Sequence, residues 1–157
     1  MYKLQTFSLL FMALAGRAQD KKALDSVDKI IINSIIKPAE QAAGDQAPNW
    51  AALEAQIKAS YSDVQTDRAV TKAKIFYYWS KDWPQFSTAL VHYTDVYEDK
   101  EDFKLMDKNA KMVVDHSTNL RDWKAALTWV QHAADKEPGN AEYKATVDAL
   151  KAKINGQ

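Results

Sequence analysis

The chain contains no cysteine. This absence excludes a CxxC redox centre, a thiol nucleophile, a cysteine-rich zinc knuckle and any disulfide bond. A chain without cysteine is compatible with an oxidising compartment, although the absence alone does not place it in one. Glycine and proline are also scarce, with four of each among 157 residues. That scarcity disfavours an all-β sandwich, which needs many tight turns.

Neither sign of charge is in excess, because 21 Lys and Arg residues balance 21 Asp and Glu residues. Without a basic field the chain attracts the phosphate backbone of nucleic acids only weakly, so we expect no nucleic-acid partner. Hydrophobic residues make up 46% of the chain and charged residues 27%, which is the balance of a globular protein. The length suits one domain of ordinary size with a core of its own.

Residues 1–18 have the layout of a secretory signal peptide. Lys3 gives a basic start, residues 4–15 are mostly apolar, and the segment Gly16–Ala18 supplies small residues before a cleavage point. The apolar run is too short to span a bilayer, so we expect no transmembrane span after cleavage. The alternative is an N-terminal core helix, and Arg17 is unusual so close to a cleavage point. The signal predicts a periplasmic or cell-surface location.

Residues 19–48 are predicted to form an N-terminal helix and a linker. The run IIINSII is rich in β-branched residues, so a strand is the alternative to a helix. Pro38 is expected to kink or end the helix. The apolar face of this helix either packs onto the rest of the chain or mediates self-association or binding to a partner or membrane. Apolar residues recur at helical spacing at Leu24, Val27, Ile31 and Ile35.

Residues 49–157 show nearly continuous helical periodicity. The connections between the predicted helices are short, so neighbouring helices should pack antiparallel. Side chains of the cap type mark where the helices should begin. These predicted starts are Asn49, Asp67, Asp82, Glu101 or Asp102, Asp122 and Asn140.

One pattern occurs twice in this region. The triplet Lys81–Trp83 recurs forty residues later as Arg121–Trp123. Similarity at such a period indicates a repeat of helical hairpins, whose apolar faces are covered by stacking on their neighbours. Each Trp is followed five residues later by Thr (Thr88, Thr128) and nine residues later by His (His92, His132).

The segment Ala126-x6-Ala133-x4-Pro138, with Trp123 before it, resembles the second helix of a tetratricopeptide repeat. In the earlier copy Phe86 and Tyr93 replace the two alanines. The resemblance implies an all-α fold of stacked antiparallel hairpins. The expected architecture is a TPR-like, right-handed α-α superhelix with an additional N-terminal helix.

A second resemblance covers most of residues 49–153. The patterns NWAALEAQIKASY, IFYYWSKDWPQFSTAL and WKAALTWVQHA are similar to the helical tail of secreted thioredoxin-family proteins of Bacteroidetes-type bacteria. In those proteins the tail follows a thioredoxin domain. This chain has neither that domain nor its CxxC motif. The resemblance therefore implies a fold, an envelope setting and an accessory role.

No constellation of side chains predicts catalysis, a cofactor or a metal site. His92 and His132 occupy equivalent repeat positions, about one helix spacing of 10 Å apart, which is too far to share a zinc ion. The sequence Asp115-His116-Ser117 does not form a triad, because adjacent residues on one helix point in different directions. No glycine-rich phosphate loop is present. We therefore expect a protein that is not an enzyme.

Four aromatic residues stand in a row at Phe76–Trp79. In a helix they cover nearly all faces, so at least one should lie near the surface, unless neighbouring helices bury all four. Exposed aromatics beside charges are typical of peptide-binding surfaces. The TPR resemblance implies that the first helix of each hairpin lines a concave binding face. The partner-binding residues predicted on that face are Arg68, Thr71, Ile75, Tyr78, Trp79, Lys108, Lys111 and Asp115.

The sequence favours a non-catalytic, secreted helical-repeat scaffold or adaptor that binds a protein or peptide in the periplasm or at the cell surface. One alternative is an accessory subunit of an envelope thiol-disulfide or other enzyme. Another is a helical protein that binds a small ligand with the Tyr/Trp cluster around Tyr78 and Trp79.

Overall fold

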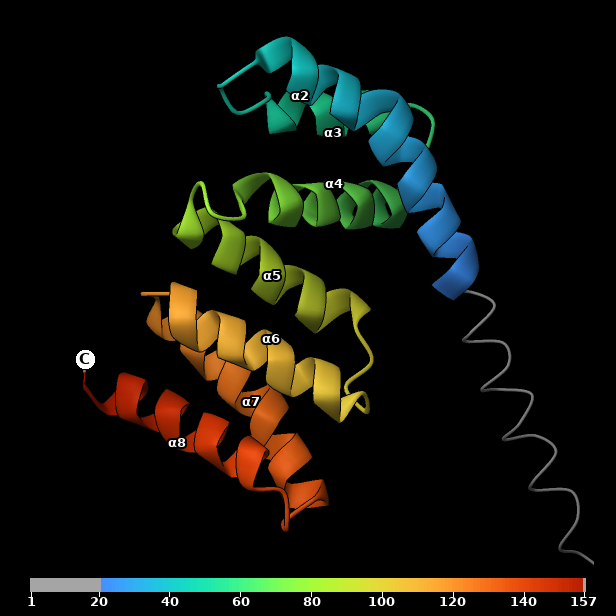
Figure 1. Cartoon of the computed structure of the whole chain (residues 1–157). Coiled ribbons are helices and arrows are strands. Elements are labelled where there is room, and N and C mark those ends of the chain that lie inside the picture. Colours follow the sequence, from blue (N-terminus) through green and yellow to red (C-terminus); the bar gives the residue numbers. More distant parts are fainter. Residues whose placement is uncertain (1–20, 157) are drawn as a thin grey trace, which may run out of the picture. The chain divides into compact units, whose positions relative to one another are not determined.

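The computed structural model describes residues 21–156 and is helical throughout its regular structure (Figure 1). The described residues contain seven α-helices, α2 to α8, preceded by helical residues 21–31 and a short π-helix. The chain divides into two compact units, and the division falls between Val70 and Thr71. The predicted signal peptide, residues 1–18, lies outside the described residues. Within residues 21–156, no helix combines the length and the apolar character needed to cross a membrane.

The first unit begins with one long helical segment, so the helix predicted for this region is confirmed and the strand alternative is not. Residues 21–31 continue through the π-helix η1 (Ile32–Ile36) into α2 (Lys37–Ala43). In η1 the Ser34 hydroxyl donates to the Ile30 carbonyl at 2.5 Å, a side-chain bond that competes with the backbone hydrogen bonds of a helix and favours a local distortion. Pro38 does not end the helix, which continues to Ala43, and the π-helix η1 lies directly before it.

The helix α3 (Trp50–Lys58) starts where the sequence predicts. The Asn49 side chain accepts from the Ala52 amide at 3.1 Å and so caps the helix. Leu53 and Ile57 are buried on one face, and α3 contacts η1. This contact covers part of the apolar stripe that residues 24–36 present.

The helix α4 (Asp63–Tyr78) begins four residues before the predicted start at Asp67. The Ser62 hydroxyl accepts from the Gln65 amide, and the Gln65 side chain accepts from the Ser62 amide at 3.1 Å. This reciprocal pair is a capping box, which satisfies two amides that the first turn leaves without helical partners. The prediction at Asp67 was wrong because it gave weight to one acidic side chain and missed the Ser–Gln pair.

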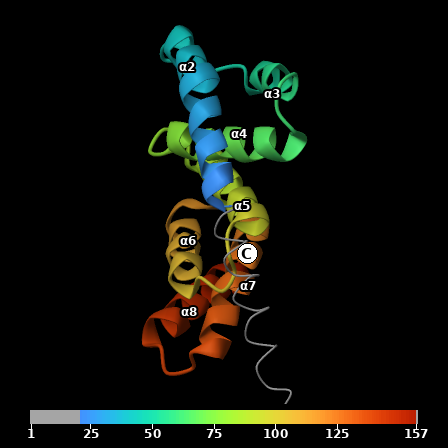
Figure 2. The same cartoon turned by 90° about the vertical axis from the view of Figure 1, so that its right-hand side faces the viewer.

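The second unit contains the end of α4 and four further helices, which are α5 (Trp83–Tyr97), α6 (Phe103–His116), α7 (Leu120–Lys136) and α8 (Ala141–Asn155). The predicted caps Asp82, Asp102 and Asn140 each accept from a backbone amide of the first turn. From α5 to α8 consecutive helices pack against each other, with α7 against both α6 and α8 (Figure 2). The protein is therefore all-α, and its helices pack mostly as sequential antiparallel pairs.

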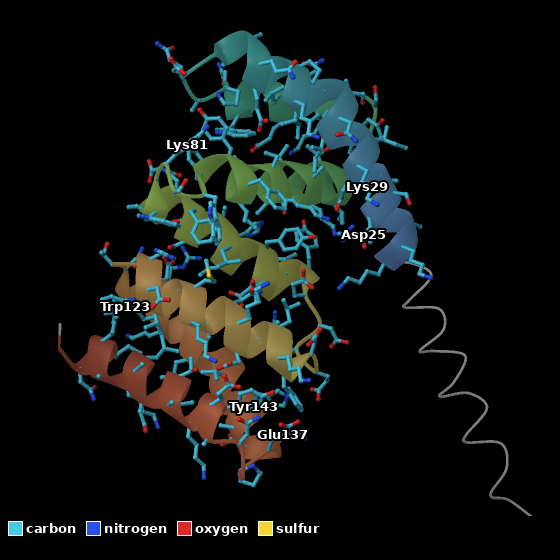
Figure 3. The ribbon with its side chains drawn as sticks, viewed as in Figure 1. Asp25, Lys29, Lys81, Trp123, Glu137 and Tyr143 are labelled. Carbon is cyan, nitrogen blue, oxygen red and sulfur yellow. The ribbon has the colours of Figure 1, made fainter. Side chains whose placement is uncertain are left out.

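The core of the second unit is built from the inward faces of α5 to α8. Phe86, Met106 and Trp123 are among its largest members. Figure 3 shows Trp123 on α7, Glu137 in the turn after α7, and Tyr143 in the first turn of α8. Burial, and then the carboxylate of Glu137, raise the pKa of the Tyr143 phenol. The small residues of the TPR-like segment, Ala126 and Ala133, are fully buried.

The two copies of the doubled pattern do not occupy equivalent helical positions. Asp82 precedes α5 and caps it, whereas Asp122 lies inside the first turn of α7. The cap of α7 is Asn119, which accepts from the Arg121 amide at 2.9 Å, so the prediction that Asp122 begins this helix was wrong. Asp122 is buried and accepts from the Ser117 hydroxyl at 2.7 Å. Trp83 is the first residue of α5, whereas Trp123 is the fourth residue of α7. The two tryptophans therefore differ by three residues in their position relative to the helix start.

Candidate functional site

The end of α4 and the start of α5 bring several rings together at one end of the second unit. We call Phe76, Trp79, Trp83 and His116 the aromatic surface. The chain turns sharply after Trp79, because Ser80 adopts a left-handed conformation with φ 61°. The Asp82 cap then starts α5 at Trp83, so the turn directs both indole rings toward the same place.

Three rings of the aromatic surface, those of Trp79, Trp83 and His116, contact one another in defined geometries. Trp83 stacks on His116, the last residue of α6, with centroids 3.6 Å apart and an interplanar angle of 10°. Trp79 meets Trp83 edge-on at 5.9 Å and Phe86 at 5.2 Å. Phe86 is buried beneath them and joins the surface to the core. Such contacts restrict ring motion, which lowers the entropy lost when a partner binds.

Two members of the aromatic surface are exposed to solvent. Phe76 is 72% exposed and Trp79 is 49% exposed. The prediction that at least one of the four consecutive aromatics lies near the surface is therefore confirmed. The ammonium of Lys81 lies 4.1 Å from the centroid of the Tyr77 ring, which is partly buried and follows Phe76 in the chain.

The predicted partner-binding residues of α4 differ in exposure. Arg68 belongs to the first unit and is buried, where it pairs with Asp25 at 2.5 Å and Asp28 at 3.2 Å. Asp25 comes from the N-terminal helical segment (Figure 3). Along the second unit's part of α4 and just after it, exposure increases in the order Thr71 (buried), Ile75 and Tyr78 (partly buried) and Trp79 (exposed).

The three predicted residues of α6 also have different surroundings. Lys111 pairs with Asp107 at 2.7 Å and Glu142 at 3.2 Å, and the hydrogen bond to Asp107 is the main cause of its raised pKa. Lys108 and Asp115 are exposed. The contact between Trp79 and His116, with centroids 6.5 Å apart, brings the residue after α4 to the end of α6 where Asp115 stands. A role for these eight residues in partner binding stays a prediction.

A second feature of the second unit is a cavity of about 550 Å³ between the end of α5, the α5–α6 connection and α7. We call it the Lys100 pocket. The Asp95 carboxylate accepts from the Trp129 indole N–H at 2.7 Å, and the Lys100 ammonium donates to the Thr94 carbonyl. The lining residues are Asp95, Lys100, Ala125, Thr128, Trp129 and His132.

Lys100 combines burial with a positive charge. Burial lowers the pKa of its ammonium, and the carboxylates of Asp95, Glu98 and Asp99 oppose that shift. At the rim, His132 lies 2.9 Å from a Glu101 oxygen and meets the Phe103 ring edge-on at 5.6 Å. The sequence reasoning singled out Thr128 and His132, as positions of the doubled pattern, but no other residue of this pocket.

The triplet Asp115-His116-Ser117 has separate partners in the structure. His116 stacks on Trp83, while the Ser117 hydroxyl donates to Asp122. Among residues 21–156 no group of three or more His, Asp or Glu side chains is arranged to hold a metal ion. Comparison of the chain with models of protein families, with curated proteins and with solved structures finds no match.

Proposed function

We propose that the chain is a non-catalytic, secreted scaffold or adaptor that binds a protein or peptide partner in the periplasm or at the cell surface. We propose further that its antiparallel helices form a TPR-like, right-handed superhelix, with the aromatic surface as the place where the partner docks. The exposure of Phe76 and Trp79 beside rings held in fixed geometry is the observation that supports this function.

The chemistry of the aromatic surface favours a partner segment with an apolar side chain. Large aromatic rings that are already ordered bury much area at a low entropy cost, which is why they dominate binding energies at interfaces. Lys81, which lies over the Tyr77 ring, and the exposed Asp115, which precedes His116, carry charges of opposite sign near the residues of this surface in the chain. The partner segment should therefore place one apolar anchor between polar residues.

The test is crosslinking in the cell envelope of the native host, followed by mass spectrometry, with wild-type protein and two single variants. Phe76→Ser removes the most exposed ring, and Val96→Ser is the matched control, because Val96 on α5 is 55% exposed and lies outside the aromatic surface. Both substitutions should leave stability within about 0.5 kcal/mol of wild type.

The proposal predicts one specific crosslinked protein for wild type and for Val96→Ser, and a yield at least about tenfold lower for Phe76→Ser. Equal yields for all three proteins would remove the aromatic surface as the docking site. Recovery of the protein from the cytoplasm with Met1 intact would contradict the secreted setting.

A further inference from the structure

The Lys100 pocket lies away from the aromatic surface. Trp83 stands at the first residue of α5 and Asp95 near its last, twelve residues later, which corresponds to about 18 Å along the helix. The pocket volume of about 550 Å³ is within the range of small-molecule sites. A ligand in this pocket would therefore not compete with a partner on the aromatic surface.

The pocket presents one group of each charge. Asp95 offers a carboxylate, of which one oxygen is held by the Trp129 indole at 2.7 Å. Lys100 offers an ammonium, whose hydrogen-bond acceptor among the described residues is the neutral carbonyl of Thr94. Within residues 21–156 no carboxylate forms a direct ion pair with Lys100. A ligand anion would give this partly buried cation a direct counter-charge.

The rest of the lining is largely apolar. Trp129 forms the buried floor, and its ring centroid lies 6.0 Å from the Lys100 ammonium. Ala125 and Thr128 line the pocket from the same face of α7. This surface suits an aliphatic side chain placed between the two charged ends of a ligand.

From this arrangement we propose that the Lys100 pocket binds a small zwitterion with an aliphatic side chain, of the amino-acid or dipeptide class. The ligand carboxylate contacts Lys100, and the ligand ammonium contacts the second oxygen of Asp95. The aliphatic side chain lies over Ala125 and Thr128. His132, held by Glu101 at the rim, contributes a polar contact to the ligand backbone.

Isothermal titration calorimetry on the full chain tests the proposal with four probes. L-leucine and L-leucyl-L-leucine carry both charges and distinguish an amino acid from a dipeptide. N-acetyl-L-leucine lacks the ammonium, and L-leucinamide lacks the carboxylate. We expect at least one zwitterion to bind, and each single-charge probe to bind at least about tenfold more weakly.

Two variants assign the charges. Lys100→Met should lower the affinity for the zwitterion to that of wild type for L-leucinamide, and it should leave the affinity for L-leucinamide unchanged. Asp95→Asn should lower the affinity for the zwitterion to that of wild type for N-acetyl-L-leucine. Lys100→Arg keeps a cation and should retain the preference for a carboxylate, which separates charge recognition from any loss of the Thr94 contact. Lys144→Met and Asp148→Asn are matched controls, because both residues line a different cavity, between α7 and α8.

Three results would overturn the proposal. One is the absence of saturable binding of both zwitterions at millimolar concentrations. Another is equal affinity for all four probes, which would show that charge is not recognised. The third is a loss of affinity in the Lys144→Met or Asp148→Asn control that is as large as the loss in Lys100→Met or Asp95→Asn. Circular dichroism of each variant at the temperature of the titration confirms that the protein compared is folded.

Discussion

Asp82 and Asp122 hold the same place in the doubled pattern, yet their surroundings predict different costs of substitution by alanine. Asp82 is exposed and caps α5 by accepting from the Gln85 amide at 3.0 Å. Asp82→Ala should therefore cost about 1 kcal/mol, the usual value of an N-cap. Asp122 is 4% exposed and accepts from the buried Ser117 hydroxyl at 2.7 Å. Asp122→Ala leaves that hydroxyl without its acceptor and should cost about 2–3 kcal/mol.

A double-mutant cycle isolates the contact between Ser117 and Asp122. Ser117→Ala removes the same hydrogen bond and also the contact of the Asn119 amide with the hydroxyl at 3.1 Å. The Trp123 indole is unaffected, because it donates to the Ser117 backbone carbonyl. The double variant should therefore lose less than the sum of the single losses, with a coupling of about 1–2 kcal/mol.

The assay is urea denaturation followed by far-UV circular dichroism and tryptophan fluorescence, with the free energy of unfolding extrapolated to water. Asp82→Ala combined with Ser117→Ala is the control pair, and its losses should add. Equal losses for Asp82→Ala and Asp122→Ala would refute the assignment of different roles. A coupling below about 0.5 kcal/mol between Ser117 and Asp122 would refute the buried bond as a source of stability.

Two further predictions concern the start of α4 and the pKa of Lys100. Ser62→Ala breaks the capping box with Gln65 and should lower the free energy of unfolding by about 1 kcal/mol. Urea denaturation measures the loss, and a loss below about 0.3 kcal/mol would contradict a role of the capping box in stability. Because the pKa of Lys100 is lowered in the folded state, the folded protein loses the Lys100 proton at a lower pH than the unfolded protein does. The free energy of unfolding therefore increases as the pH rises toward 10.5. The difference in unfolding free energy between wild type and Lys100→Met should therefore shift in favour of wild type between pH 7 and 10.5, and a constant difference would contradict the shift.

The helix starts show how far local sequence determines this fold. At Asn49, Asp82 and Asn140 one cap-type side chain precedes the first turn, so the sequence and the structure agree. At Asn119 and Asp122 two candidate caps stand three residues apart. The choice between them depends on Ser117, which holds Asp122 in a buried contact that a local pattern does not reveal.

The two surfaces of the second unit depend on the sequence in different ways. Four consecutive aromatics in a helix must expose at least one ring, so the exposure of Phe76 and Trp79 follows from local geometry. The stack of Trp83 on His116 depends on how α5 packs against α6 and was not predicted. The Lys100 pocket is formed by residues that are far apart in the sequence, between Asp95 and His132, and no local pattern marks it.

The π-helix near the start of the described residues affects how this helix should respond to a change in chain length. Ile31 and Ile36 are both fully buried although they are five residues apart, a spacing that rotates side chains by about 140° in a regular α-helix. The wider turn compensates for this rotation, so the segment holds one residue more than an α-helix with the same buried face would hold. Removing the exposed Asn33 would leave the two isoleucines at the ordinary spacing of four. Shortening α6 or α7 by one residue would instead turn every later side chain by about 100°, away from the core.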